Sequence, residues 1–345
     1  MPLISVSMAS YNHSEYLSQA IESVLNQTFR DLELIIIDDA SQDASRSCIE
    51  NYAGQDDRIR TIFHDKNQGI AFTANQGMAA AKGKYITFID SDDVWMPEKL
   101  QKQIDILARD ENLVVWSEGL IIDETDTPTG ETFTGMNHSQ DRERNGYIFE
   151  DLLKGNHILA SSMIFKRENL RGIKFNDQFE YLNDFQFNVE MARLYKFYFI
   201  QEPLVYYRVH SRSTVQADYE GHILDYPKVG LYFLEKYGQD ISNAGKIQIF
   251  RNTTEYLQGL ISQQRDIISQ QKNTLNIPGT GFRPLVCRFF CLLITGKLHI
   301  YDITNRFSVR FSQASQSSRS RSLISEGCDN IYPDKNENTT TPGKK

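Results

Sequence analysis

The sequence predicts an α/β fold with a mostly parallel central sheet and a helical C-terminal appendage. Three observations support this prediction. Short apolar segments alternate with amphipathic segments through the first 116 residues, which is typical of right-handed βαβ units. Acidic residues directly follow two of the apolar segments. The alternation stops after Trp116, and the rest of the chain has a different character.

Five apolar segments are predicted to form the strands of this sheet. They are rich in β-branched and aromatic residues, as buried strands are. In chain order these strands are 3–8, 33–37, 59–63, 85–89 and 113–116. The segments between them carry apolar residues at helical spacing. We therefore expect helices at 14–26, from about Asp43 to about Tyr52, at 70–81, and from Pro97 to about Ala108.

The second half of the chain has a less regular pattern. Residues 118–146 are polar and indicate a hairpin or a loop excursion. Helical patterns occupy 147–155, 184–196 and most of 222–275, and residues 203–210 favour a further strand. From about Ser312 the chain is too polar to bury a core, so we predict a disordered tail over 312–345.

The segment 282–300 is short, apolar and edged with Arg and Lys, and three interpretations of it remain open. It could be a helix buried against the rest of the protein. It could lie in a membrane interface with Arg283, Arg288 and Lys297 near lipid phosphates. It could also enter a bilayer without crossing it, because it is too short to span one with confidence. The second interpretation would suit a protein on the inner face of the plasma membrane.

Composition and charge argue against several classes of protein. A net charge of −8 over 345 residues does not suggest a nucleic-acid binder. The N-terminus lacks the pattern of a secretory signal, and no run of about 18 apolar residues predicts a transmembrane helix. The spacing of the four cysteines, Cys48, Cys287, Cys291 and Cys328, fits no zinc site. We therefore expect a cytoplasmic protein with free thiols.

Polar and acidic residues follow three of the predicted strands. The sequences are MASYNH (8–13), IIIDDAS (35–41) and FIDSDDV (88–94). Ligands of open α/β sheets bind at the carboxyl ends of the strands, so we expect these three ends to share one edge. Carboxylates gathered there repel one another unless a cation holds them. Because Mg²⁺ and Mn²⁺ are commonly bound by one or two carboxylates and substrate phosphates, the pattern predicts a metal–diphosphate site.

These motifs, together with NQGIAFTANQGMAAAKGKYITFIDSDD, resemble those of the inverting glycosyltransferases of family 2. The resemblance covers roughly residues 3–215 and rests on several motifs in the order that the family shows. It implies a GT-A fold, a nucleotide-sugar donor and a hydroxyl acceptor. Mn²⁺ or Mg²⁺ is the implied cofactor.

The resemblance assigns the donor-binding residues to the ends of the first, second and fourth strands. It implies that Ala9 and Tyr11 contact the base and that Asp39 accepts a hydrogen bond from a ring N–H. The Asp-x-Asp motif corresponds to Asp90-Ser91-Asp92, with Asp92 as a metal ligand and Asp90 near the ribose or a metal-bound water. A further stretch between the base and diphosphate sites corresponds to Asn67, Gly69 and Asn75.

The second half carries the residues that the resemblance implies for the acceptor reaction. Asp184 corresponds to the general base, and His210, in a Tyr-Arg-x-His motif, to a residue that contacts the metal or diphosphate. Two positions depart from the family. Asn183 stands where relatives have Glu, and Glu190 stands where they usually have Arg. These departures concern the orientation of the acceptor and the properties of Asp184 as a base. They leave the residues of the donor half unchanged.

Each of these residues also has a structural interpretation. Asp90 or Asp92 could cap the helix at Pro97, Asp39 could cap the helix at 43–52, and Asp184 could cap its own helix, because Asp is favoured at helix N-termini. His210 could be a polar strand-end residue without a ligand. A single cap requires one acid, however, and three acids stand in FIDSDDV.

The leading hypothesis is an inverting transferase of a hexose-type sugar, with a UDP-sugar as the expected donor and a glycan or lipid-linked glycan of the cell surface as the acceptor. We divide the chain into a catalytic domain at 1–220, with a donor half at 1–116 and an acceptor half at 117–220. A helical region follows at 221–311. One alternative is a non-catalytic scaffold that binds nucleotide-sugars or glycans. Another is a sugar nucleotidyltransferase, although MASYNHSEY lacks the glycine that such enzymes usually show there.

Overall fold

The computed structural model describes residues 1–139, 141–213 and 219–275. Its first four strands are β1 (Ile4–Ser10), β2 (Leu32–Asp38), β3 (Ile59–Phe63) and β4 (Tyr85–Asp90). They form parallel pairs in the order β3-β2-β1-β4. The register places Ser10 beside Asp38 and Ala9 beside Asp90, so the strands end together. The predicted strands and the predicted parallel arrangement are confirmed here.

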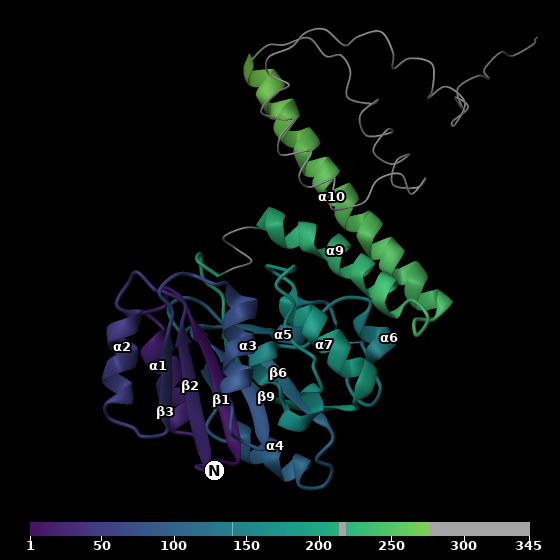
Figure 1. Ribbon diagram of the computed structural model, residues 1–345. Coiled ribbons are helices and arrows are strands. Elements are labelled where there is room, and N and C mark those ends of the chain that lie inside the picture. Colours follow the sequence, from purple (N-terminus) through teal and green to yellow (C-terminus); the bar gives the residue numbers. More distant parts are fainter. Residues whose placement is uncertain (140, 214–218, 276–345) are drawn as a thin grey trace, which may run out of the picture. The chain divides into compact units, whose positions relative to one another are not determined.

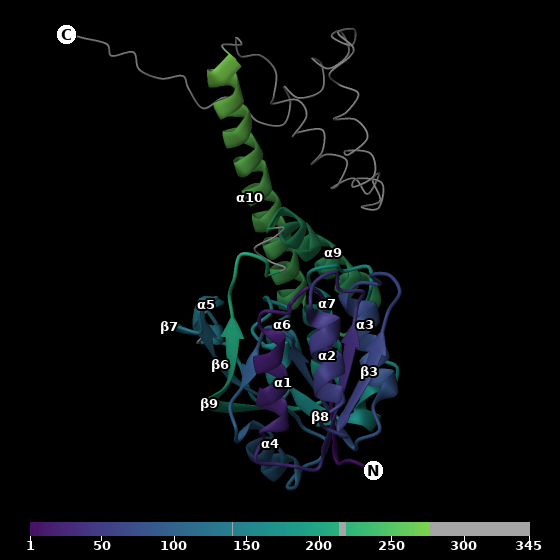
Figure 2. The same ribbon diagram turned by 90° about the vertical axis from the view of Figure 1, so that its left-hand side faces the viewer.

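Helices cover both faces of this sheet (Figures 1 and 2). One face packs against α1 (Leu17–Leu25), α2 (Ser45–Ala53) and α4 (Lys99–Leu107), and the other packs against α3 (Ile70–Ala80) and α7 (Asn183–Leu194). Helix α3 approaches β1 so closely that a Cβ atom at Gly77 would lie 2.0 Å from the Ser7 hydroxyl. Any larger residue at position 77 would therefore push α3 away from the strand ends.

The second half of the sheet is mixed. The strands are β5 (Val94–Trp95), β6 (Val114–Ile122), β7 (Pro128–Thr132), β8 (Ile164–Lys166) and β9 (Phe197–Arg208). The order continues as β4-β8-β6-β9-β5, with β7 paired to β6. Strand β8 is antiparallel to both β4 and β6. The predicted hairpin within 118–146 is confirmed as β6–β7, whereas β5 and β8 were not predicted because each is only two or three residues long.

Short helical turns fill the connections of this half. They are α5 (Phe133–Met136), α6 (Phe149–Leu152), η1 (Ala160–Ser162) and η2 (Arg167–Leu170). The helix predicted at 147–155 is therefore a single turn, and the one predicted at 184–196 is α7. The predicted strand at 203–210 begins earlier, at Phe197.

The predicted C-terminal helices are α9 (Tyr219–Tyr237) and α10 (Asn243–Leu275). Val229 and Phe233 of α9 and Ile249 of α10 belong to the same hydrophobic core as α7. One compact unit runs from Met1 to Gln263. The core therefore crosses residue 220, and the functional division of the chain remains a prediction.

Several predictions lie outside the described residues. These are the alternatives for 282–300, the disordered tail, and the thiols of Cys287, Cys291 and Cys328. Cys48, on α2, is a free cysteine. Within residues 1–139, 141–213 and 219–275, no helix combines the length and apolar character needed to cross a membrane.

Candidate donor, metal and acceptor site at the carboxyl edge of the sheet

The loops that follow β1, β2 and β4 meet at one edge of the sheet, as predicted. The backbone N–H of Asp39 donates to the carbonyl of Ser10 at 2.9 Å, and the backbone N–H of Asn12 donates to the Ser41 hydroxyl at 2.9 Å. The ring Nδ1 of His13 lies 2.8 Å from the Ser91 hydroxyl. These contacts join the polar ends of β1, β2 and β4 in one site.

Asp39 is buried and its carboxylate is tightly held. Oδ1 accepts a hydrogen bond from the backbone N–H of Gln68 at 2.7 Å and lies 2.7 Å from Nδ1 of His64. Oδ2 accepts from the backbone N–H of Gly69 at 2.9 Å. Gly69 has a φ of +88°, which favours glycine and turns its N–H toward the carboxylate. Asp39 therefore joins the β2 loop to the start of α3.

Other residues predicted to bind the donor differ in exposure and in their contacts. Ala9 is partly buried at the end of β1, and Tyr11 is 44% exposed beyond it. Asn67 is exposed, and its Oδ1 accepts from the N–H of Gly69 at 3.1 Å. The Asn75 amide instead bonds both backbone groups of Phe175, at 2.8 and 3.0 Å. Tyr11 is thus free to meet a ligand, whereas Asn75 connects α3 to the acceptor half.

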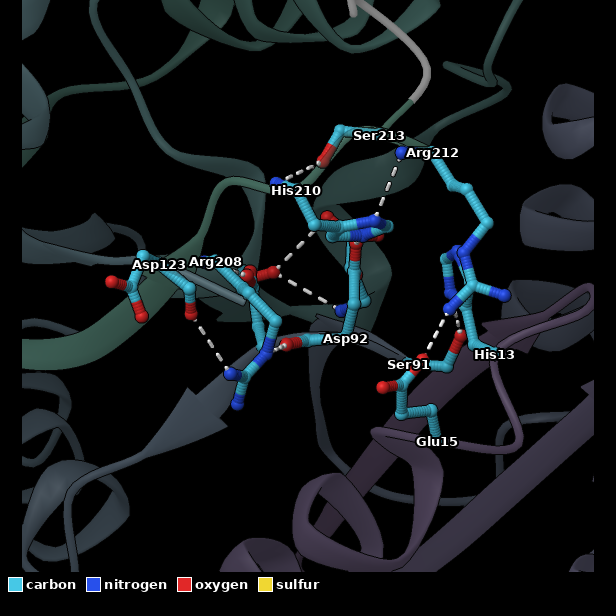
Figure 3. Close-up of polar contacts among 12 residues, drawn as sticks. His13, Glu15, Ser91, Asp92, Asp123, Arg208, His210, Arg212 and Ser213 are labelled. Carbon is cyan, nitrogen blue, oxygen red and sulfur yellow. Dashed lines mark hydrogen bonds and ion pairs between the residues drawn. The ribbon is translucent and has the colours of Figure 1, made fainter. Parts of the chain in front are cut away.

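His13, Asp92 and His210 form a compact group of three potential metal ligands (Figure 3). One ligand atom from each lies within 4.8 Å of the others. His210 Nε2 is 3.0 Å from Asp92 Oδ2, and the His13 and His210 ring centroids are 5.6 Å apart. The predicted pair of Asp92 and His210 is thus brought together, and His13 joins it from the β1 loop.

The electrostatics of this group favour ionisation of Asp92. Burial opposes ionisation of Asp92, but the hydrogen bond from His210 and the charges of both histidines outweigh it and lower the pKa of the carboxyl. Burial lowers the pKa of His13 and is opposed by the charge of Asp92. A neutral His13 retains a lone pair on its ring, which a metal ligand requires.

Asp90 and Asp93 flank Asp92 and favour protonation. Burial and the charge of Asp92 raise the pKa of Asp90 to about 7, and its Oδ2 accepts from the Ser161 hydroxyl at 3.2 Å. Burial, Asp92 and Asp90 raise the pKa of Asp93 well above its usual range. Asp93 Oδ1 accepts from the backbone N–H of Arg208 at 3.1 Å. The three acids therefore differ in role, with Asp92 as the anion.

Arg208, buried on β9, fixes the position of Asp92. Its Nε donates to the carbonyl of Asp92 at 2.8 Å, and its other nitrogens donate to the carbonyl of Asp123 at 3.2 Å and to Oε1 of Gln19 at 2.6 Å (Figure 3). Its guanidinium also lies 4.7 Å from the centroid of the Tyr16 ring. One side chain thus ties the loop after β4, the β6–β7 hairpin and α1 together beside the three potential metal ligands.

Asp184 lies in the first turn of α7 on the acceptor side. Its Oδ2 accepts from Nδ2 of Asn156 at 2.9 Å, and its Oδ1 accepts from the backbone N–H of Phe185 at 2.6 Å. Burial raises the pKa of Asp184 to about 6. Its charge also contributes to the raised pKa of Asp90. A carboxylate with this pKa accepts a proton more readily than an ordinary aspartate does.

The two departures from the family are accommodated by contacts within the acceptor half. Nδ2 of Asn183 donates to the carbonyls of Phe179 and Glu180 at 3.3 and 3.2 Å. Glu190 accepts from the hydroxyl of Tyr232 at 2.6 Å and from Nζ of Lys236 at 2.8 Å, both on α9. Glu190 therefore holds α9 against α7.

The capping interpretations are wrong for the acids of the donor half. The N-cap residue of α2 is Ala44 and that of α4 is Glu98, and neither helix has a side-chain cap. Asp184 is an acid of the first turn of α7, whose N-cap residue is Leu182. Capping of α2 and α4 thus does not explain Asp39 or Asp92, and the ligand-binding roles of these two residues remain predictions.

Sequence reasoning missed four residues of the site: His13, Asn156, Ser161 and Arg208. His13 and Arg208 stand inside motifs that were recognised, so their proximity to assigned residues was an available signal. Asn156 and Ser161 lie in an irregular connection, and no spacing in the sequence relates them to Asp184 or Asp90. Their roles depend on long-range packing of the chain.

Comparison with known proteins identifies the family. The model of Glycosyl transferase family 2 matches residues 5–202. A putative glycosyltransferase, EpsH of Bacillus subtilis, is 32% identical over 228 residues, which cover 62% of this chain and 63% of EpsH. The chain therefore spans less than two thirds of the length of this relative.

Two solved structures share the fold. Residues 1–349 of TarS of S. aureus, in complex with UDP-GlcNAc, give a TM-score of 0.57 at 18% identity, covering 74% of this chain and 72% of that one. The mannosyltransferase PcManGT of Pyrobaculum calidifontis, in complex with GDP-Man and Mn²⁺, gives 0.53 at 14% identity, covering 80% and 81%. With the family match over more than half of its length, the chain belongs to glycosyltransferase family 2 and has the GT-A fold.

Proposed function

We propose that the chain is an inverting glycosyltransferase that transfers a sugar from a nucleotide-diphosphate donor to a hydroxyl group of a glycan or lipid-linked glycan. The expected donor is a UDP-sugar, and the expected product is part of a cell-surface polysaccharide. One observation carries the proposal. Burial raises the pKa of Asp184 to about 6, and the charge of Asp184 acts on Asp90, two residues before the Asp92 of the carboxylate–imidazole group.

The donor would lie along this edge. Tyr11 is exposed and follows Ser10, whose carbonyl accepts from the backbone N–H of Asp39, which favours contact with the base in this region. The diphosphate would lie toward Asp92, with Asp90 near the ribose. TarS with UDP-GlcNAc and PcManGT with GDP-Man supply the precedent that this fold binds nucleotide-sugars.

The metal-binding group fits a divalent transition ion. Asp92 supplies carboxylate oxygen, and His13 and His210 supply imidazole nitrogens. Mg²⁺ prefers an all-oxygen environment, whereas imidazole suits transition metals, so this donor set favours Mn²⁺ over Mg²⁺. When bound, the metal stabilises the negative charge that develops on the departing diphosphate.

The chain's own residues provide the remaining chemistry. Asp184 takes the proton of the acceptor hydroxyl while that oxygen bonds to the anomeric carbon. The bond between the anomeric carbon and the donor phosphate oxygen breaks, and the nucleoside diphosphate leaves with its electron pair. Attack from the face opposite the leaving group inverts the anomeric centre. Asn156 holds the Asp184 carboxylate in place for this proton transfer.

Nucleotide binding and product analysis test the proposal. Thermal unfolding is measured with UDP, GDP, dTDP and CDP, each with and without Mn²⁺. A ligand of the folded state at 100 times its Kd adds about 2.7 kcal/mol to the free energy of unfolding, so a specific metal-dependent shift is expected. NMR of the glycoside formed from the matching donor should show the inverted anomer. A stable protein that responds to none of the nucleotides would contradict the proposal and favour a scaffold.

A further inference from the structure

His64 is a partly buried histidine that the proposed reaction does not use. It directly follows β3, and its side chain is 8% exposed. Its backbone N–H donates to the carbonyl of Asp38 at 2.9 Å, which fixes the residue to the end of β2. Its ring lies between Asp39 of the β2 loop and Gln76 of α3. The edge of the Phe72 ring closes a third side, with the centroids 5.7 Å apart.

Both ring nitrogens of His64 face oxygen atoms that can only accept. Nδ1 lies 2.7 Å from Oδ1 of Asp39, and Nε2 lies 2.7 Å from Oε1 of Gln76. Two acceptors are satisfied together when both nitrogens carry protons, as in the imidazolium ion. Burial opposes this charge, but the hydrogen bonds to Asp39 and Gln76 and the charges of Asp39 and Asp38 outweigh it and raise the pKa of His64.

The contact determines which part of Asp39 remains available to a ligand. A carboxylate offers about four lone-pair positions, two on each oxygen. His64 and the N–H of Gln68 occupy Oδ1, and the N–H of Gly69 occupies one position of Oδ2. One position on Oδ2 is left. Because the other three donors fix the plane of the carboxylate, the remaining lone pair has a defined direction.

We propose that His64 is a specificity-determining positioning residue, which orients Asp39 so that one lone pair accepts a ring N–H of the donor base. This inference rests on the proposed function and deepens it. Uracil, thymine and guanine present a ring N–H at their pairing edge, whereas the corresponding ring nitrogen of cytosine is an acceptor. A fixed carboxylate lone pair attracts the first group and repels cytosine. His64 would thus act on base selection and leave the chemical step unchanged.

Two isosteric variants separate the two bonds of the ring. In His64→Asn the side-chain amide can replace Nδ1–H and keep the bond to Asp39. In His64→Gln the amide reaches the position of Nε2 and keeps the bond to Gln76 alone. Dissociation constants for UDP, GDP and CDP are measured by calorimetry on the full chain with Mn²⁺, and circular dichroism confirms that each variant folds.

We expect the Asn variant to bind its preferred nucleotide within about threefold of the parent. The Gln variant should bind it about tenfold more weakly, and its preference over CDP should fall by a similar factor, because tenfold corresponds to about 1.4 kcal/mol, within the range of one hydrogen bond to a charged group. The maximal turnover rate should not change in either variant. Equal affinities in both variants, or an unchanged preference over CDP in the Gln variant, would overturn the inference.

A spectroscopic measurement on the parent chain keeps the test independent of the variants. Nitrogen-15 shifts of the His64 ring at pH 7 should show that both nitrogens are protonated, and a single protonated nitrogen would contradict the proposed contact. The outcomes also separate the two proposals. A parent chain that binds no nucleotide removes the proposed function and this inference with it. Selective binding that is unaffected by His64→Gln removes only the role of His64.

Discussion

In the half of the sheet built by β1 to β4, parallel register alone places Ser10 beside Asp38 and Ala9 beside Asp90. In the half that contains α7, Asp184 depends on the amide of Asn156, 28 residues earlier, and α7 depends on contacts with α9. The donor half therefore builds its site from the ends of regular elements. The acceptor half builds its site from packing between distant segments.

Substitutions in the two halves should therefore have different effects on binding, catalysis and packing. A substitution at a strand end of the donor half should remove a proposed ligand and leave the sheet intact. A substitution in the acceptor half should either remove the proposed base or loosen the helices that hold it. The experiments below are ordered from the largest expected effect to the smallest.

Replacing Asp92 should have the largest effect. In Asp92→Asn the anionic ligand is lost from the group formed with His13 and His210. We expect turnover to fall by about 10³-fold or more, since metal stabilisation of the leaving group supplies several kcal/mol. Steady-state rates across a Mn²⁺ titration measure the loss. Asp31→Asn, at an exposed position directly before β2, is the matched control and should remain active. Full activity in Asp92→Asn would contradict the proposed role of Asp92 as the anionic metal ligand.

Replacing the base should separate chemistry from donor binding. In Asp184→Asn the side chain keeps its size and loses its ability to take a proton. We expect kcat to fall by about 10²- to 10⁴-fold, the usual contribution of general base catalysis. The Kd for the nucleotide, measured by calorimetry, should be unchanged because the donor half is untouched. A parallel loss of nucleotide binding would show that the two halves are not independent.

The pH dependence of kcat should follow the ionisation of Asp184. The base must be ionised, and its pKa is about 6, so kcat should rise about tenfold per unit below pH 6 and level off above it. In Asn156→Leu the hydrogen bond that favours the carboxylate is lost, so the inflection should move to higher pH. Rates from pH 5 to 8 at saturating donor test this, and an inflection at the same pH in both proteins would exclude the role of Asn156.

The smallest effect is expected at the contact between α7 and α9. Lys236→Met leaves the buried Glu190 without its cation. Because the Lys236 side chain is 44% exposed, solvent screens the pair, and we expect a loss of about 1–2 kcal/mol in the free energy of unfolding. Burial opposes ionisation of Glu190, but its contacts with Lys236 and Tyr232 lower its pKa.

The sign of the pH effect follows from this lowered pKa. The stabilisation by Glu190 is fully present above the usual glutamate pKa of about 4.3 and is lost as the pH falls through the lower pKa of the folded state. Urea unfolding of Lys236→Met and the parent should therefore differ at pH 7 and converge in strong acid. Lys102→Met, which breaks an exposed pair with Glu202, is the control and should change stability by less than about 1 kcal/mol. A nucleotide Kd altered by Lys236→Met would contradict the independence of the donor half.

The same contrast explains what could be predicted from the sequence. The parallel strands, the shared edge and the meeting of Asp92 with His210 followed from periodicity, strand ends and family motifs. Strand β8 was not predictable because three residues carry too little periodicity, and its position between β4 and β6 is decided by packing. The contacts of Asp184 with Asn156 and of Glu190 with Lys236 join residues 28 and 46 positions apart, and nothing in the local sequence indicates them.

The distance along the chain between Asp92 and its partners has a consequence for the order of folding. Arg208 and His210 contact Asp92 across 116 and 118 residues. During synthesis the N-terminal part of a chain emerges first, so β1 to β4 can pair well before β9 exists. We therefore expect high-affinity Mn²⁺ binding only after residue 210 has joined the sheet. A nascent chain that ends near residue 116 would carry the acidic motif without a working site, and metal affinity would mark completion of folding.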